Sequence, residues 1–148
     1  MKKVAVILAG CGTMDGSEIN ETVTLLLALD QHNIEYQAFA PDAYQAEVCN
    51  HTTGKRETEK RNMMVEAARI VRGKILPLSK FNADDFDALL FPGGNGAAKN
   101  IFTYAYAPLE RRRNEAVQME SLLGGFCHPR VVCLLDVLLL LLGDGHRL

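Results

Sequence analysis

The feature that most constrains the fold is a short apolar run near the amino end, Val4 to Ala9, that stops abruptly at glycine. The run is continuous and rich in β-branched residues, which suits a strand buried on both faces of a parallel sheet. A loop rich in Gly and containing Asp, residues 10–16, follows it directly. The run therefore predicts the first strand of an α/β fold.

Helical spacing follows the loop and gives way to a second strand. Ser17 stands where a helix N-cap is expected, and Asn33 ends the pattern. Residues 34–40 then alternate in polarity and stop at Pro41, as a strand does. The apolar positions that mark the helix are Ile19, Val23, Leu26 and Leu27.

The same alternation of helix and strand continues to about residue 96. Residues 59–72 predict a second helix ended by Gly73, and residues 74–78 a short strand. Residues 87–91 predict a further strand, followed by the glycine-rich turn 92–96. This alternation predicts a doubly wound parallel sheet, in which ligands bind beyond the carboxyl ends of the strands.

Composition excludes several classes of partner. The chain has 148 residues, enough for one domain, and a net charge of -2, so nucleic acid is not an expected partner. Residues 131–142 are apolar apart from Asp136, and this stretch is well short of the roughly 20 residues of a membrane helix. Four scattered cysteines predict reduced thiols, from which we expect a cytoplasmic protein. The four histidines are too scattered to indicate zinc, and no metal site is expected.

Three blocks of sequence carry a family resemblance. They are ILAGCGTMDGSEINE (7–21), TEKRNMMVEAARIVRGKI (58–75) and FPGGNGAAKN (91–100). In this order and at this spacing they resemble the class I glutamine-amidotransferase-like (ThiJ/PfpI) superfamily, and within it the enhancing-lycopene-biosynthesis, glyoxalase-like branch. The resemblance implies a flavodoxin-like doubly wound sandwich.

The resemblance covers residues 1–104 well and then weakens. LLGDGHRL (141–148) is similar to a later segment of the family, but the stretch before it is shortened and divergent. We therefore expect a single domain over residues 1–148 that is truncated or divergent, with the family's carboxyl-terminal portion missing.

A cysteine nucleophile is the central part of the chemistry that the resemblance implies. Cys133 follows the β-branched pair 131–132, close to the family position, although residues 134–136 depart from the family's Ile-Ala-Pro turn. Cys127, followed by His128, is the rival nucleophile. In a third interpretation both are ordinary buried cysteines that pack in the core.

An acid and a set of backbone amides would complete the site. Glu21 matches the family's Glu-x-Val pattern, and Glu18 lies three residues away on the same helix face. The pair Gly93 and Gly94 can present amides to an oxyanion. Cys11, in the loop after the first strand, is a candidate second thiol.

By resemblance, the function is that of a glyoxalase-like lyase without a cofactor, acting on small 2-oxoaldehydes and linked to isoprenoid biosynthesis. We expect a homodimer. The alternative is a catalytically inactive redox-sensing or partner-binding α/β module. Glutamine amidotransferase activity is less favoured, because it requires a downstream His-x-Glu pair that this sequence does not contain.

Overall fold

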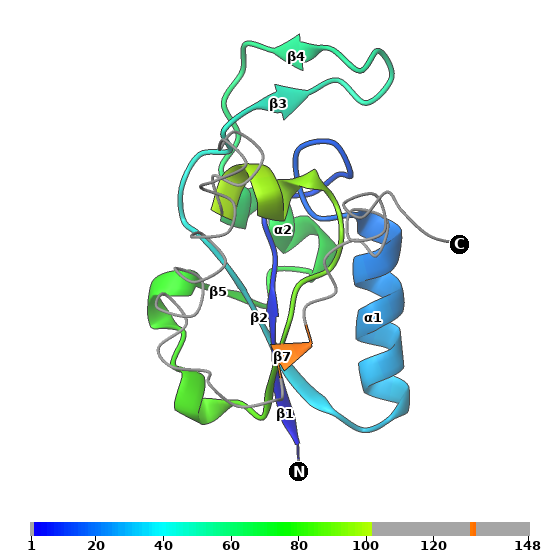
Figure 1. Cartoon of the computed structure of the whole chain (residues 1–148), viewed down its shortest axis with the longest axis vertical. Coiled ribbons are helices and arrows are strands. Elements are labelled where there is room, and N and C mark those ends of the chain that lie inside the picture. Colours follow the sequence, from blue (N-terminus) through cyan, green and yellow to red (C-terminus); the bar gives the residue numbers. More distant parts are fainter. Residues whose placement is uncertain (1, 102–130, 133–148) are drawn as a thin grey trace, which may run out of the picture.

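A parallel β-sheet forms the centre of the computed structural model, which describes residues 2–101 and 131–132 (Figure 1). The strands lie in the order β5-β2-β1-β6-β7, and every neighbouring pair is parallel. Their bounds are β1 Lys3–Ile7, β2 Glu35–Ala40, β5 Ile75–Pro77, β6 Ala88–Leu90 and β7 Val131–Val132. The predicted doubly wound α/β fold is confirmed.

The two faces of the sheet are covered by different elements. On one face, Val4 and Val6 of β1 pack in a cluster with residues of α1 (Ile19–Gln31) and α2 (Met63–Ile70). On the other face, Ile7 packs with the aromatic residues Phe39 and Phe81. Two 3₁₀ turns, Leu78–Lys80 and Ala83–Asp85, and a π-helical turn, Ala97–Ile101, lie in the chain on either side of β6. The apolar run Val4 to Ala9 is thus buried on both faces of the sheet, as predicted.

The strand order creates a topological switch point between β1 and β6. From β1 the chain moves outward through α1, β2 and α2 to β5, and then returns to the other side of β1 as β6. The connections after β1 and β6 therefore leave in opposite directions at the carboxyl edge. In open α/β sheets a crevice forms at such a point, and ligands bind there.

The cap of α1 differs from the prediction. Glu18, not Ser17, is the N-cap, and its carboxylate accepts from the amide of Glu21 at 2.6 Å. Ser17 is buried, and its hydroxyl accepts from the amide of Ala9 at 2.9 Å. The Ser17 hydroxyl is therefore already hydrogen-bonded to the segment that follows β1 and does not cap the helix. The next residue, Glu18, is the N-cap instead.

The buried face of α1 also differs from the prediction. Thr22 and Leu29 are buried, whereas Ile19, Val23 and Leu27 are 44%, 50% and 54% exposed. The apolar residues of α1 cover more of its circumference than the contact with the sheet requires, so spacing alone could not identify the inward face.

A small antiparallel hairpin stands over the carboxyl end of the sheet (Figure 1). It consists of β3 (Val48–Cys49) and β4 (Arg56–Glu57). Sequence reasoning predicted α2 from residue 59, but the helix begins at Met63, after the N-cap Asn62. The helix ends at Ile70, with Val71 as its C-cap, two residues before the predicted end at residue 72. The chain becomes left-handed at Arg72 (φ +53°) and stays so at Gly73 (φ +77°), whose amide donates to the carbonyl of Ala68.

Candidate functional site

Gly93, in the turn after β6, is held from both sides by the first turn of α1. Its amide donates to Oε2 of Glu21 at 2.8 Å, and its carbonyl accepts from the amide of Glu18 at 2.7 Å. The two loops at the switch point are thereby joined. The structure thus brings together three of the residues singled out from the sequence.

The two glutamates take different positions. The Oε2 of Glu18 accepts from the amide of Glu21, so this carboxylate serves as the helix cap. The carboxylate of Glu21 instead reaches the turn after β6. Glu21 is exposed as a whole residue, and the bond of its carboxylate to Gly93 is partly buried.

Gly93 lies against the side chain of Glu21, whereas Gly94 lies so close to other backbone that glycine is needed there. A Cβ built on Gly93 would collide with the carboxylate of Glu21. One built on Gly94 would lie 2.5 Å from the amide nitrogen of Glu18 and 2.5 Å from the carbonyl oxygen of Gly16. Gly94 also has a φ of +99°, which side-chain-bearing residues rarely adopt.

The amide of Gly94 differs from that of Gly93 in the partners it has in the described part of the chain. Among residues 2–101 and 131–132 it donates to no acceptor, whereas the amide of Gly93 is used by Glu21. Gly94 is half-buried. A carboxylate and a spare amide at one edge can together move a proton and stabilise an oxyanion.

The two candidate nucleophiles, Cys133 and Cys127, lie outside the described residues. The strand that precedes Cys133 in the sequence is described: in β7, Val132 pairs in parallel with Leu90 of β6. Leu90 lies three residues before Gly93 in the chain. The strand leading to Cys133 is therefore the neighbour of the strand leading to the glycine turn.

Cys11 follows β1 in the switch-point loop and is half-buried. Burial raises the pKa of its thiol above the ordinary value, and the negative charge of Glu66 raises it further. Burial, followed by the charge of Glu47, likewise raises the pKa of Cys49. Both environments favour the neutral thiol over the nucleophilic thiolate.

Asn100 is a positioning residue that sequence reasoning missed. Its Nδ2 donates to the carbonyls of Ala9 (3.0 Å) and Asp15 (2.8 Å), and its Oδ1 accepts from the amide of Ala46 (2.9 Å). One side chain thus ties the end of β1, the switch-point loop and the segment before the hairpin. In the sequence, the feature that could have indicated this role is the position of Asn100 at the end of the block FPGGNGAAKN.

Lys99 makes a second tie beside it. Its Nζ donates to the carbonyl of Met14 at 3.0 Å and to the carboxylate of Glu47. Arg56 of β4 also pairs with Glu47, at 2.8 Å. The hydrogen bond from Lys99 lowers the pKa of Glu47 below its ordinary value, so this carboxylate stays ionised.

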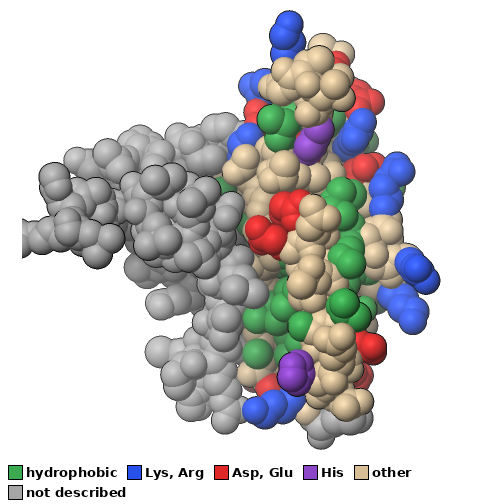
Figure 2. All heavy atoms as spheres, turned by 90° about the vertical axis from the view of Figure 1, so that its right-hand side faces the viewer, with side chains coloured by type: hydrophobic (Ala, Val, Ile, Leu, Met, Phe, Trp, Pro, Cys, Tyr) green, Lys and Arg blue, Asp and Glu red, His purple; other side chains and the backbone are tan. Residues whose placement is uncertain are grey.

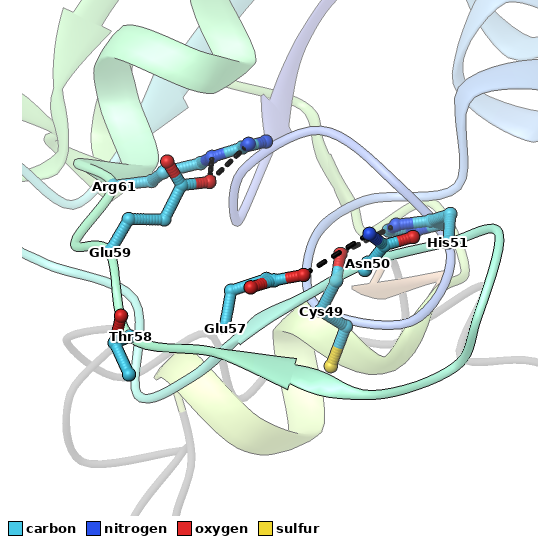
Figure 3. Close-up of a pocket in the computed structure, with 7 residues that line it drawn as sticks. All are labelled: Cys49, Asn50, His51, Glu57, Thr58, Glu59 and Arg61. Atoms are coloured by element: carbon cyan, nitrogen blue, oxygen red, sulfur yellow. Dashed lines mark hydrogen bonds and ion pairs between the residues drawn. The ribbon is translucent and has the colours of Figure 1, made fainter.

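A separate polar cavity of about 560 Å³, open to solvent, lies along the hairpin (Figure 3). Its charged and amide groups largely satisfy one another, since Arg61 donates to Glu59 and Asn50 donates to Glu57. None of the lining residues belongs to α1 or to the turn after β6. They are Cys49, Asn50, His51, Glu57, Thr58, Glu59 and Arg61.

His51 and Asp15 fasten this hairpin to the switch-point loop. Nε2 of His51 accepts from the amide of Met14 at 3.2 Å, and its Nδ1 lies 3.1 Å from the carbonyl of Cys49. The buried carboxylate of Asp15 accepts from the amide of Cys49 at 2.6 Å. The hairpin is therefore part of the scaffold of the site.

Two kinds of feature are absent from the described part of the chain. There, no three His, Cys, Asp or Glu side chains come together in a way that suits a metal ion. None of its helices has the length and apolar character needed to cross a bilayer.

The chain is similar to proteins of known sequence and of known structure. The human protein named glutamine amidotransferase-like class 1 domain-containing protein 3, mitochondrial, is 45% identical over 117 residues, which cover 78% of this chain and 44% of the human protein. The chain is therefore homologous to a glutamine amidotransferase-like class 1 domain protein. The rat ES1 protein homolog, mitochondrial, is 44% identical over the same length and with the same coverage. No protein-family model matches the chain.

A solved structure supports the fold independently. The crystal structure of an isoprenoid biosynthesis protein with an amidotransferase-like domain from Ehrlichia chaffeensis superposes with a TM-score of 0.71 at 41% identity. The match covers 81% of this chain and 56% of that one. The chain thus spans less than half of the curated relatives and just over half of the solved one.

The predicted cytoplasmic location is wrong. Both curated relatives carry the word mitochondrial in their names, which conflicts with a cytoplasmic protein. The prediction rested on scattered, reduced cysteines, and these argue only against an oxidising compartment. They do not distinguish one reducing compartment from another.

Proposed function

We propose that this chain contributes to a glyoxalase-like site that needs no cofactor and converts small 2-oxoaldehydes, such as glyoxal and methylglyoxal, to 2-hydroxy acids. The observation that carries the proposal is the contact of the Glu21 carboxylate with the Gly93 amide at the switch point. The strand that leads to Cys133 lies beside β6 and supports the same placement. The family relationship is compatible with enzymes but does not by itself specify this reaction.

The reaction begins when the Cys133 thiolate adds to the aldehyde carbon and forms a hemithioacetal. The amide of Gly94 stabilises the negative charge that develops on oxygen. Glu21 then removes the proton from that carbon and returns it to the adjacent one, which gives the thioester of the 2-hydroxy acid. Water hydrolyses the thioester and releases the product and the thiolate, so the net change is the addition of one water.

The second candidate function is a catalytically inactive, partner-binding module. The exposed apolar residues on the outer face of α1 favour it. The raised pKa values of Cys11 and Cys49 count against redox sensing by those two thiols. A link to isoprenoid biosynthesis, named for the Ehrlichia chaffeensis relative, stays part of the proposal.

Thiol mapping joined to an activity assay tests the proposal. The protein is labelled briefly with limiting iodoacetamide at neutral pH, each cysteine is followed by peptide mass spectrometry, and methylglyoxal consumption is measured. We expect Cys133 to be labelled far faster than Cys11 and Cys49, and Glu21→Ala to change that rate. Cys133→Ser should abolish turnover, while Cys127→Ser, the matched control, should retain it.

Two other results would contradict the proposed nucleophile or the proposed reaction. Fast labelling of Cys127 together with loss of turnover in Cys127→Ser would move the nucleophile to that residue. Equal labelling of all four cysteines with no methylglyoxal consumption would refute the enzymatic function and favour the partner-binding module.

A further inference from the structure

Both ring nitrogens of His51 contact backbone groups, and these contacts fix the position of the ring proton. Nε2 accepts from the amide of Met14 at 3.2 Å, so this nitrogen carries no hydrogen. The proton of the neutral ring is therefore on Nδ1, which lies 3.1 Å from the carbonyl oxygen of Cys49 and donates to it (Figure 3). The neutral ring thus joins the hairpin to the switch-point loop, residues 10–16.

A buried carboxylate lies beside the accepting nitrogen. The side chain of Asp15 is 3% exposed, and its Oδ1 lies 3.8 Å from Nε2 of His51. Its Oδ2 accepts from the amide of Cys49 at 2.6 Å, whereas Oδ1 accepts no hydrogen bond from residues 2–101 and 131–132. Because a buried carboxylate oxygen is stabilised by a hydrogen bond, a donor on Nε2 would be favoured here.

Glycine at residue 12 lets the ring and the carboxylate approach each other. A Cβ built on Gly12 would lie 2.6 Å from Nε2 of His51 and 3.3 Å from Oδ1 of Asp15. Gly12 also has a φ of +133°, which side-chain-bearing residues rarely adopt. The loop therefore leaves Nε2 and Oδ1 facing each other with no side chain of residue 12 between them.

Solvent protons can reach His51 through the polar cavity, which its side chain lines and in which it is 40% exposed. Arg61 neutralises Glu59, and the thiol of Cys49 is uncharged because burial raises its pKa. Asp15 therefore supplies the negative charge that lies against Nε2. The titratable and charged side chains that face His51 from the hairpin and the segment after it are Cys49, Glu57, Glu59 and Arg61.

We propose that His51 is a pH-sensitive latch between the hairpin and the switch-point loop. When Nε2 takes up a proton from solvent, it changes from an acceptor to a donor, turns to Oδ1 of Asp15 and releases the amide of Met14. Nδ1 donates to the carbonyl of Cys49 in both states, so the ring pivots about that bond. Histidine suits this change, because its charge ordinarily changes between about pH 8 and pH 5.

The switch-point loop also holds the turn after β6. The carbonyl of Thr13, next to Met14, accepts from the amide of Asn95 at 2.8 Å, and the carbonyl of Gly16 accepts from the amide of Gly96 at 2.8 Å. Release of the Met14 amide therefore loosens a loop that is bound directly to the turn of the candidate site. The latch consists of these hydrogen bonds alone and does not require the proposed reaction.

NMR of the full chain between about pH 8 and pH 5 tests the latch. Imidazole ¹⁵N shifts report the proton on each ring nitrogen, and exchange with water, corrected for its intrinsic dependence on pH, reports each amide. At the alkaline end we expect the proton of His51 on Nδ1 only. Protonation of Nε2 should lower the protection of the Met14 amide about fivefold or more. The amide of Gly54, which donates to Asn50 within the hairpin, should keep its protection.

Two variants distinguish the latch from a general loosening in acid. Asp15→Asn keeps an acceptor for the Cys49 amide but removes the charge, so protonation of Nε2 should require a more acidic solution. His51→Gln keeps an acceptor for Met14 but gains no charge, so protection of that amide should no longer depend on pH. The matched control is His32→Gln, at the exposed C-cap of α1, which should retain the dependence.

Three results would overturn the proposal. The first is a proton on Nε2 of His51, in place of Nδ1, at the alkaline end of the range. The second is protection of the Met14 amide that does not change when Nε2 is protonated. The third is an equal loss of that protection with pH in His51→Gln and in His32→Gln.

Discussion

The amide of Gly93 donates a 2.8 Å hydrogen bond to Oε2 of Glu21, although 72 residues separate them in the chain. The carbonyl of Gly93 accepts from the backbone of Glu18 in the same helical turn. The turn after β6 therefore cannot shift without breaking both bonds, so the acid and the amides of the candidate site are held in one relative position.

Glu21→Gln should separate chemistry from structure at this contact. The amide oxygen of Gln can still accept from Gly93, so the melting temperature should change little. The proton transfer is lost, and turnover of methylglyoxal should fall by about a hundredfold or more. Glu35→Gln, an exposed change on β2, should leave both values unchanged, and unimpaired turnover in Glu21→Gln would remove Glu21 from the mechanism.

Gly94→Ala should destabilise the protein through crowding as well as backbone strain. The added methyl group meets the backbone of Glu18 and Gly16. Gly73→Ala is the matched control, because Gly73 also has a positive φ but nothing lies within 4 Å of its Cβ position. Urea unfolding should show a loss of about 1 kcal/mol in the control and clearly more in Gly94→Ala.

Asn100→Ala should loosen the loops around the site. It leaves the carbonyls of Ala9 and Asp15 and the amide of Ala46 without their partner, at a cost of about 2 kcal/mol in the free energy of unfolding. Asn82→Ala removes a single, long 3.4 Å bond on the surface and should cost far less. The rate of amide hydrogen exchange should rise in the switch-point loop of Asn100→Ala. An unchanged rate would show that Asn100 does not hold this loop in place.

Acid should weaken the tie between Lys99 and Glu47. The pKa of Glu47 is lowered in the folded protein, so the folded state binds fewer protons than the unfolded state in this range. The pair's contribution is therefore complete above the ordinary pKa of 4.5 and is lost as the pH falls through the lower folded value. Glu47→Gln should flatten the dependence of stability on pH below 4.5, and an unchanged slope would show that other carboxylates dominate.

Some features of the fold follow from local chemistry and were visible in the sequence. The continuous apolar run at Val4 to Ala9 can satisfy its backbone and bury both faces only inside a parallel sheet. The turn after α2 contains Gly73 in a left-handed conformation, which suits glycine. The glycine-rich loops after β1 and β6 marked the carboxyl edge for the same reason, since close backbone approach there excludes side chains.

Other features depend on contacts between distant parts of the chain. Ser17 could have capped α1, but its hydroxyl is taken by Ala9, and Glu18 caps instead. Which glutamate faces the glycine turn was decided by the packing of α1 on the sheet, which also turned Val23 outward. The sequence by itself determined the strands, the helices and the edge at which they meet, because these rest on local patterns. Only the tertiary structure decided which side chains meet there, because that depends on how the helices rotate against the sheet.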